Sequence, residues 1–165
     1  MKSLHPILRQ YLLALVLLSS GLMIACQQES QGLTMGELNE LAMAYAAAWS
    51  SQDSERLASY YARNGFLRIN DGDPSVGREA VTETARSFMS AFPDMVISLV
   101  ELRRVDDEVQ FHWHWTGTYT GPGGNGNAVD LRGYEQWTLD DDGLILQSLG
   151  YYDETEYQRQ LNAGQ

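Results

Sequence analysis

Apolar and polar side chains alternate strictly along residues 109–115, and the apolar positions carry valine, phenylalanine and two tryptophans. Because successive side chains point to opposite faces of a β-strand, this pattern predicts a strand with one aromatic face and one polar face. Tryptophans on one face require a large apolar layer opposite them. We interpret the aromatic face as the floor of a cavity, and the rest of the chain as its walls.

The remaining pattern divides the chain into a helical part followed by a part made of strands. Apolar residues at helical spacing predict helices over residues 34–51, 55–62, 78–92 and 154–161. Besides the central strand, apolar runs bounded by turn residues predict strands over 66–70, 96–105, 129–139 and 144–152. This order favours an α+β domain, in which a curved antiparallel sheet is covered on its concave face by the N-terminal helices. Such a cone forms a pocket if its mouth is not filled by side chains.

The first residues have the form of an export signal. Lys2 and Arg9 precede an apolar run over residues 11–25, which is short for a membrane-spanning helix and ends at Cys26. The residues before this cysteine resemble the lipobox of bacterial lipoproteins, with Met23 where leucine is more usual.

These features divide the chain into a lipoprotein signal over residues 1–26, a polar tether over 27–36 and a domain over 37–165. We expect an exported protein of the bacterial cell envelope, attached to the membrane only through lipid on Cys26. The sequence leaves open an ordinary secretory signal, or an uncleaved anchor, in which the cysteine is incidental.

Composition narrows the chemistry of the domain. Cys26 is the only cysteine, so the domain has neither an internal disulfide nor a catalytic thiol. Without the signal, the chain has nine arginines, no lysine and 22 acidic residues, a formal charge of −13. A lysine Schiff base is thereby excluded, and binding to nucleic acid or to an anionic membrane surface is disfavoured. We interpret the acidity as a source of solubility, and the alternative is a cationic partner.

Several short motifs occur in a fixed order along residues 38–161. They are Ala47–Trp49 followed by Asp53, Gly77–Val81 opening a helix that ends with Ala91–Asp94, Trp115–Gly121, and Asp142–Ile145 leading to Tyr152–Asp153. Together they resemble the SnoaL-like polyketide cyclase and ester cyclase branch of the nuclear transport factor 2-like superfamily. The resemblance implies a cone-shaped domain that needs no cofactor. It does not choose among cyclase, isomerase, dehydratase and non-catalytic roles, because this fold hosts all of them.

The resemblance also implies roles for two residues. In the cyclases an aspartate after the last strand acts as general acid or base, and Asp153 matches that position. A histidine commonly follows the Gly-Thr pair, where this chain has Tyr119, whose hydroxyl can still donate a hydrogen bond. Asp153 has a simpler alternative role as the N-cap of the terminal helix.

One acidic residue is unusual on the strand predicted over residues 129–139. Glu135 shares its face only with apolar or small residues. Burial there would disfavour the carboxylate and raise the pKa of Glu135, as in a general acid or base. Because neighbouring strands lie about 5 Å apart, Glu135 and Asp153 could project into one cavity and divide acid and base duties. The alternative for Glu135 is an ion pair with Arg68 or Arg132.

His112 and His114 are two residues apart, so both point to the side of the central strand opposite the tryptophans. If the aromatic face is the interior, the histidines lie on the outer sheet face, where we expect a hydrogen-bonding role or a homodimer interface. A zinc site is the weaker alternative, and we predict no metal. An inverted strand, with the histidines in the cavity, would change this interpretation.

Three functional hypotheses follow. In the first, a small hydrophobic carbonyl compound occupies the cone, Asp153 and Glu135 move a proton, and Tyr119 stabilises the enolate. In the second, the pocket binds an aromatic or lipid-like molecule without turnover. In the third, the polar sheet face binds a second copy or another envelope protein. The residues predicted to contact a ligand are Tyr45, Trp49, Tyr61, Arg68, Trp113, Trp115, Trp137 and Tyr151.

Overall fold

The computed structural model describes residues 32–164. The predicted signal with Cys26, and residues 27–31 of the predicted tether, lie outside the described residues. Within residues 32–164, none of the helices combines the length and the apolar character that a membrane-spanning segment needs.

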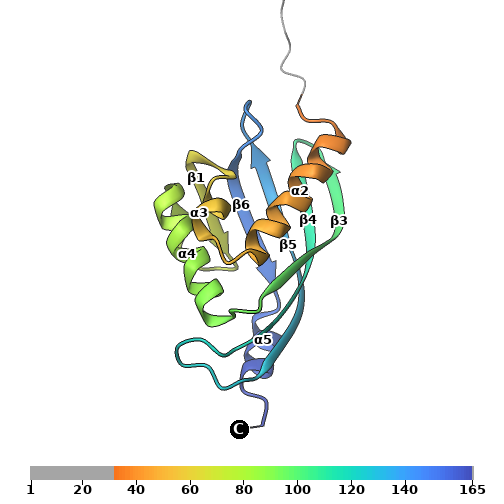
Figure 1. Cartoon of the computed structure of the whole chain (residues 1–165). Helices are drawn as coiled ribbons and strands as arrows, with labels where there is room; N and C mark the ends of the chain where they lie inside the picture. The colour runs from red at the N-terminus through yellow and green to blue at the C-terminus, as the bar shows by residue number, and fades with distance from the viewer. Residues whose placement is uncertain (1–31, 165) are drawn as a thin grey trace, which may run out of the picture. The chain divides into compact units, whose positions relative to one another are not determined.

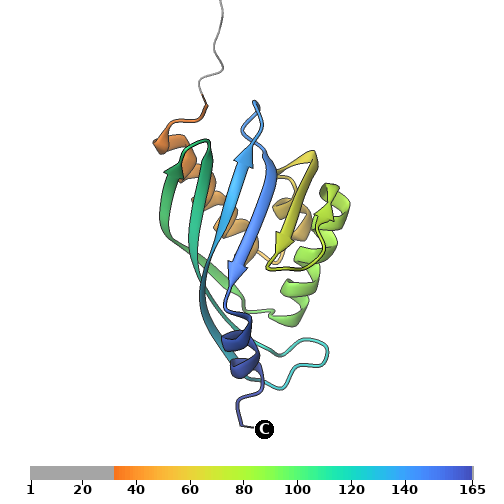
Figure 2. The same cartoon turned by 180° about the vertical axis from the view of Figure 1, so that it is seen from behind.

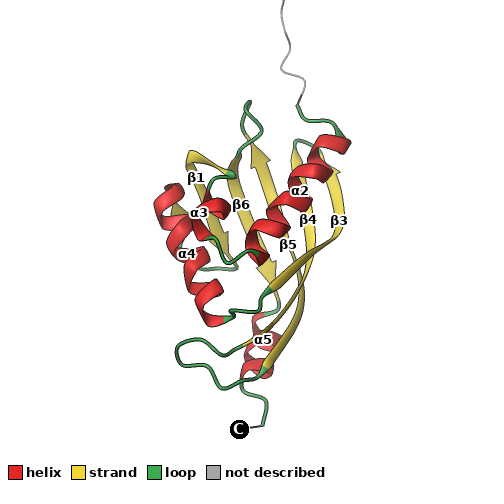
Figure 3. Ribbon diagram, viewed as in Figure 1, coloured by secondary structure: helices red, strands yellow, loops and turns green. Residues whose placement is uncertain are grey.

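Helices and strands follow the order expected of an α+β domain (Figure 3). The helices are α2 (Met35–Ser50), α3 (Ser54–Ala58), α4 (Gly77–Ala91) and α5 (Glu154–Leu161). The strands are β1 (Tyr61–Ile69), β2 (Ser75–Val76), β3 (Val96–Val105), β4 (Glu108–Thr118), β5 (Ala128–Leu139) and β6 (Ile145–Tyr152). They form one six-stranded sheet in the order β2-β1-β6-β5-β4-β3. Neighbouring strands are antiparallel, except that β1 and β6 run parallel.

The domain has two layers, with α2, α3 and α4 on one face of the curved sheet (Figure 1). α2 packs across β3, and α4 lies along β1. Within the described residues, the opposite face of the sheet carries no helix (Figure 2). α5 lies at one end of the sheet and packs against β5. The predicted fold class is therefore confirmed, with the parallel β1–β6 pair as an addition.

The alternation along β4 places its odd-numbered residues in the core, as predicted. The buried residues of β4 are Val109, Phe111, Trp113 and Trp115, and the residues between them are half-buried on the other face. β5 follows the same parity, and its buried residues are Val129, Leu131, Glu135 and Trp137. A slip of one residue in register would expose all of these side chains, so their burial fixes the pairing of the two strands.

Side chains satisfy free backbone amides at the starts of α2 and α5. Thr34 and Glu37 form a capping box at α2, with Thr34 N donating to the Glu37 carboxylate at 2.8 Å and Glu37 N donating to Thr34 Oγ1 at 3.3 Å. Asp153 caps α5 by accepting a 3.0 Å hydrogen bond from the backbone amide of Glu156. Each cap stabilises its helix by about 1 kcal/mol.

The second helix is shorter than the sequence pattern predicts. A helix over residues 55–62 was expected, but α3 ends at Ala58, and Tyr61 begins β1. The amide of Ile145 donates to the carbonyl of Tyr60 at 2.9 Å, so the chain pairs with β6 directly after the helix. Adjacent tyrosines fit a helical and a strand pattern equally well, and here tertiary pairing decides between them.

Candidate functional site

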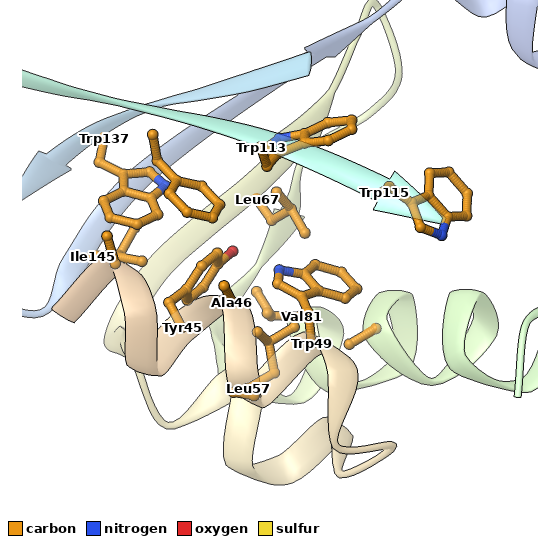
Figure 4. Packing of buried hydrophobic residues seen from close by; sticks show 14 of the residues in the cluster. Tyr45, Ala46, Trp49, Leu57, Leu67, Val81, Trp113, Trp115, Trp137 and Ile145 are labelled. Carbon is orange, nitrogen blue, oxygen red and sulfur yellow. The ribbon is translucent and has the colours of Figure 1, made fainter. Parts of the chain in front are cut away.

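A cavity of about 60 Å³ lies between the sheet and helices α2 and α4. Figure 4 shows Trp49 of α2 facing Trp113 and Trp115 of β4 across this space, with Leu67 of β1 beside them. The lining is aromatic and aliphatic except for one charged residue, Glu135. The lining residues are Trp49, Leu67, Ile69, Phe88, Met95, Ile97, Trp113, Trp115, Glu135, Gly150 and Tyr152.

The register of three strands places Glu135 in this lining. Glu135 of β5 pairs with Phe111 of β4 and with Gly150 of β6. A Cβ atom at Gly150 would lie 3.6 Å from Glu135 Cγ, so the missing side chain leaves open space beside the glutamate. Gly133 lies on the same face of β5 as Glu135, and a Cβ atom there would clash with the indole ring of Trp113. The two glycines therefore make room for a tryptophan ring and for the cavity.

Hydrogen bonds hold Glu135 through a single carboxylate oxygen, Oε2. Tyr45 Oη donates to Oε2 at 2.9 Å, Trp137 Nε1 donates at 2.9 Å, and Ser148 Oγ donates at 2.6 Å. No hydrogen bond between residues 32–164 reaches the other oxygen, Oε1. Because Oε2 already accepts three bonds, Oε1 is the oxygen that can carry a proton or contact a ligand.

Burial changes how Glu135 titrates. Desolvation raises the pKa of Glu135 above its ordinary value of 4.5, although its three hydrogen bonds oppose the rise. The hydroxyl of Tyr45 donates its hydrogen bond to Glu135, so the hydroxyl of Tyr61, 2.8 Å away, donates to Tyr45. Burial, followed by the charge of Glu135, raises the pKa of both phenols well above 10. The tyrosines therefore stay neutral, and Glu135 is the group of this network that gains or loses a proton.

The structure separates the predicted aromatic set into two groups. Trp49, Trp113 and Trp115 line the cavity, as predicted. Tyr45, Tyr61 and Trp137 are fully buried and do not line it. Tyr45 and Trp137 contact Glu135, and Tyr61 contacts Tyr45, so this second group positions the glutamate.

The predicted place of Arg68 in the cavity is corrected by the structure. Leu67 and Ile69, on either side of it, line the cavity, so alternation along β1 directs Arg68 to the outer sheet face. No ion pair joins Glu135 to Arg68 or Arg132 in the described part of the chain. The predicted alternative of an ion pair between Glu135 and one of these arginines is therefore wrong.

Tyr151 is also placed on the outer face. It is Tyr152 that lines the cavity, while Tyr151 stacks on Tyr134 with ring centroids 5.0 Å apart. Two adjacent tyrosines give no parity signal of their own. Which of them faces inward depends on the register with β5, and that register shifts by one residue between Thr138 and Leu139.

The two residues that the family resemblance implied lie outside the lining. Asp153 is exposed, and its side chain caps α5, so the simpler alternative for it is confirmed. Tyr119 stacks on Phe92 with ring centroids 5.3 Å apart, next to the loop after β4. Neither residue lines the cavity that contains Glu135. Their roles in proton transfer stay predictions.

The two histidines lie on the outer sheet face, as predicted. His112 stacks on Tyr134 with ring centroids 5.4 Å apart, and His114 Nε2 lies 2.7 Å from an oxygen of Asp130. Within residues 32–164, no group of three or more histidine, cysteine or acidic side chains is arranged to hold a metal ion.

Ser148 and Tyr152 belong to the site but were not predicted. Ser148 is fully buried on β6, opposite Trp137, and its hydroxyl makes the shortest bond to Glu135. A serine in a strand is usually a surface residue, so the sequence gives no signal for this role. In the structure, positions 148, 150 and 152 share one face of β6, but the irregular pattern of this strand does not identify that face from the sequence.

A second depression adjoins the cavity. It has a volume of about 560 Å³ and shares Ile69 and Tyr152 with the cavity lining. Its charged residues are Asp71 and Glu154, and it contains no arginine. We call this depression the outer groove, lined by Ile69, Asn70, Asp71, Gly72, Tyr151, Tyr152 and Glu154.

A curved sheet with helices over one face and a cavity between the layers defines the ketosteroid isomerase-like class of folds. Within this class, residues 39–161 match the model of the SnoaL-like polyketide cyclase family, and the chain belongs to that family. The resemblance seen in the sequence motifs is therefore confirmed. A comparison with curated proteins gives no match.

Solved structures share the fold at low sequence identity. TsrD from Streptomyces laurentii is 21% identical, with a TM-score of 0.68 over 79% of this chain and 98% of that chain. A protein from Catenulispora acidiphila DSM 44928, in complex with trimethylamine, is 18% identical, with a TM-score of 0.66 over 74% of this chain and 92% of that chain. A phenazine biosynthesis-related protein from Pseudomonas aeruginosa is 17% identical, with a TM-score of 0.61 over 78% and 91%. These neighbours show that the chain shares their fold.

Proposed function

We propose that this domain binds a small, largely apolar molecule in the tryptophan-lined cavity, with Glu135 as its polar contact. The observation that carries the proposal is a buried carboxyl group among aromatic side chains, fixed through Oε2 and free of hydrogen bonds at Oε1. Binding pockets typically combine an apolar lining with a few placed polar groups that orient the ligand.

The volume of the cavity limits the size of the ligand. About 60 Å³ is far below the several hundred Å³ of typical ligand pockets. It admits about four to six non-hydrogen atoms, judged by the space that one water molecule needs. A compact molecule, or the compact end of a longer one extending into the outer groove, therefore fits. Trimethylamine, named with the Catenulispora acidiphila structure, is a molecule of this size.

We also propose that the domain is held at the cell envelope by lipid on Cys26. The support is the basic, then apolar, signal-like segment that ends at this cysteine. Replacing Cys26→Ala should move the protein from the membrane fraction to the soluble envelope fraction. A protein that sediments equally with and without the cysteine would contradict lipidation.

Binding can be measured through the protein's own tryptophans, because Trp49, Trp113 and Trp115 line the cavity. We expect members of a panel of small ketones, alcohols and amines to change tryptophan emission in a saturable way. Gly150→Ala places a methyl group beside Glu135 and should weaken binding of any compound that reaches the cavity. Gln147→Ala, on the outer face of the same strand, is the matched control and should bind like the wild type.

The proposal fails if no compound of the panel saturates the emission change. It also fails if Gly150→Ala and Gln147→Ala respond identically, because binding would then lie outside the cavity.

Proton transfer by Glu135, without a cofactor, is the second candidate function. It is favoured by the raised pKa of Glu135 and by the orientation of Oε1, which suit a group that takes a proton from carbon next to a carbonyl and returns it. NMR in deuterated water would detect deuterium uptake at that carbon of a bound ketone. Glu135→Gln should abolish the uptake. If Asp153→Asn abolishes the deuterium uptake and Glu135→Gln does not, Asp153 is the residue that transfers the proton.

A further inference from the structure

We infer that the molecule bound in this cavity is a small organic cation of the alkylated ammonium class, with its alkyl groups against the tryptophan rings and its charge beside Glu135. The inference rests on the proposed function, because it names the ligand class of the same site. Three features of the described residues carry it: the ring arrangement, the single carboxylate, and the acidic outer groove.

Aromatic rings approach the cavity from both layers of the domain. Trp49 of α2 contacts Phe88 of α4 with centroids 6.2 Å apart, and Phe88 contacts Trp115 of β4 at 6.0 Å. On the sheet, Trp113 contacts Tyr152 of β6 at 6.5 Å. The face of an aromatic ring is electronegative, so several rings around one space attract an alkylated ammonium ion. The same rings also accept its alkyl groups as apolar surface.

Glu135 is the only formally charged residue of the lining. A buried carboxylate is costly unless a positive group or sufficient hydrogen bonds accompany it. Its three donors all reach Oε2, so a cation beside Oε1 would complete the compensation. A calcium or magnesium ion would need several further oxygen ligands, and the only other side-chain oxygen in the lining is the phenol of Tyr152. An alkylated ammonium ion needs no such ligands.

The outer groove has the same sign of charge. Its acidic side chains are Asp71 and Glu154, and neither the groove nor the cavity contains an arginine. The chain as a whole has a formal charge of −11. This distribution attracts cations toward Glu135 and repels anions. A neutral apolar molecule would fill the space but would leave Oε1 of Glu135 without a partner.

The test compares two molecules of nearly equal size that differ in charge. Tetramethylammonium chloride and tert-butanol, which have the same number of non-hydrogen atoms, are titrated into the protein by calorimetry at constant ionic strength. Mildly alkaline pH is used, because burial raises the pKa of Glu135. We expect tetramethylammonium to bind at least about tenfold more tightly than tert-butanol. Glu135→Gln should remove this preference, and Gln147→Ala should keep it.

Each outcome decides between the proposals. Equal affinity for the two molecules, or a preference that survives Glu135→Gln, overturns the cation inference and leaves the proposed function standing. Binding of tert-butanol or of small ketones without binding of tetramethylammonium does the same. If no small molecule of any class binds in the cavity, the proposed function fails as well.

Discussion

A carboxyl group buried among aromatic rings is the residue-scale feature that requires a physical reason. Three side chains donate hydrogen bonds to one oxygen of Glu135, and one of them, Tyr45, lies 90 residues away in the sequence. Such bonding orients the group without fully neutralising it, and it leaves Oε1 available. The burial of Glu135 followed from strand parity. Its donors could not be predicted, because they depend on how α2 and β6 pack against β5.

The titration of Glu135 makes a testable contribution to stability. Because the pKa of Glu135 is raised in the folded state, folding binds a proton in the pH range from about 4.5 up to that raised pKa. The wild type should therefore lose stability relative to Glu135→Gln as pH rises through this range, and the difference should level off above it. Taking the difference cancels the other carboxylates. Urea unfolding of both proteins at a series of pH values provides the measurement.

Two results would contradict this prediction. A stability difference independent of pH would mean that Glu135 titrates alike in the folded and unfolded states. A wild type that gains stability over Glu135→Gln with rising pH would mean that the hydrogen bonds outweigh burial and lower the pKa of Glu135.

At the scale of elements, sequence patterns predicted those strands in which one face is strictly apolar. β4 and β5 have this alternation, and both are found with the expected face inward. β6 contains the adjacent Tyr151 and Tyr152, so its pattern does not identify the inner face. β1 begins within a pair of tyrosines, so its pattern does not identify the first residue of the strand. These two strands supply Tyr152, Ser148 and Leu67, which explains why these three residues of the site were missed.

Two of the sequence motifs that resemble the family, Ala91–Asp94 and Trp115–Gly121, contact each other at the connection between α4 and β3. The side chain of Asp94 accepts hydrogen bonds from Thr118 N and from Thr118 Oγ1, both at 2.7 Å. These bonds lower the pKa of Asp94 below its ordinary value of 3.8. They join the end of β4 to the segment that follows α4. We interpret these motifs as structural, which agrees with the absence of both residues from the cavity lining.

Removing the two hydrogen bonds between Asp94 and Thr118 should lower the free energy of unfolding. Asp94→Ala loses both acceptors and should lower the free energy of unfolding by about 1–2 kcal/mol, reduced from the buried case because the site is exposed. Asp94→Asn keeps one acceptor oxygen and should cost less. Urea unfolding at neutral pH compares the three proteins. Equal stability of Asp94→Ala and wild type would show that these two hydrogen bonds do not stabilise the fold.

At the scale of the whole molecule, the fold and the presence of a cavity were predictable, but the volume of the cavity was not. The order of motifs along residues 38–161 is enough to indicate the family, which the match over residues 39–161 confirms. The volume of the cavity depends on a few glycines and on side-chain packing between layers. Gly133 and Gly150 have this effect only because of their register with Trp113 and Glu135. Alternation excludes a slip of one residue but not of two, so the sequence does not specify which residue lies opposite each glycine.

The outer sheet face suggests an assembly. Within residues 32–164 it carries no helix (Figure 2), and His112, Tyr134 and Tyr151 form a stacked row across three strands. We propose that a second copy of the chain covers this face. Light scattering should then give the mass of a dimer, and His112→Glu should shift the protein toward monomer, because it introduces a charge into the row. A monomer at all concentrations would contradict the proposal.

The most direct measurement of the central claim is a crystal structure of the protein grown with tetramethylammonium and, separately, with tert-butanol. In crystals of the wild type we predict an ordered molecule between Trp49 and Trp113, in contact with Glu135 Oε1. In Glu135→Gln crystals grown with tetramethylammonium we predict no such molecule. A cavity closed by its own side chains under both conditions, or ligand bound only on the surface, would contradict a binding role for this cavity.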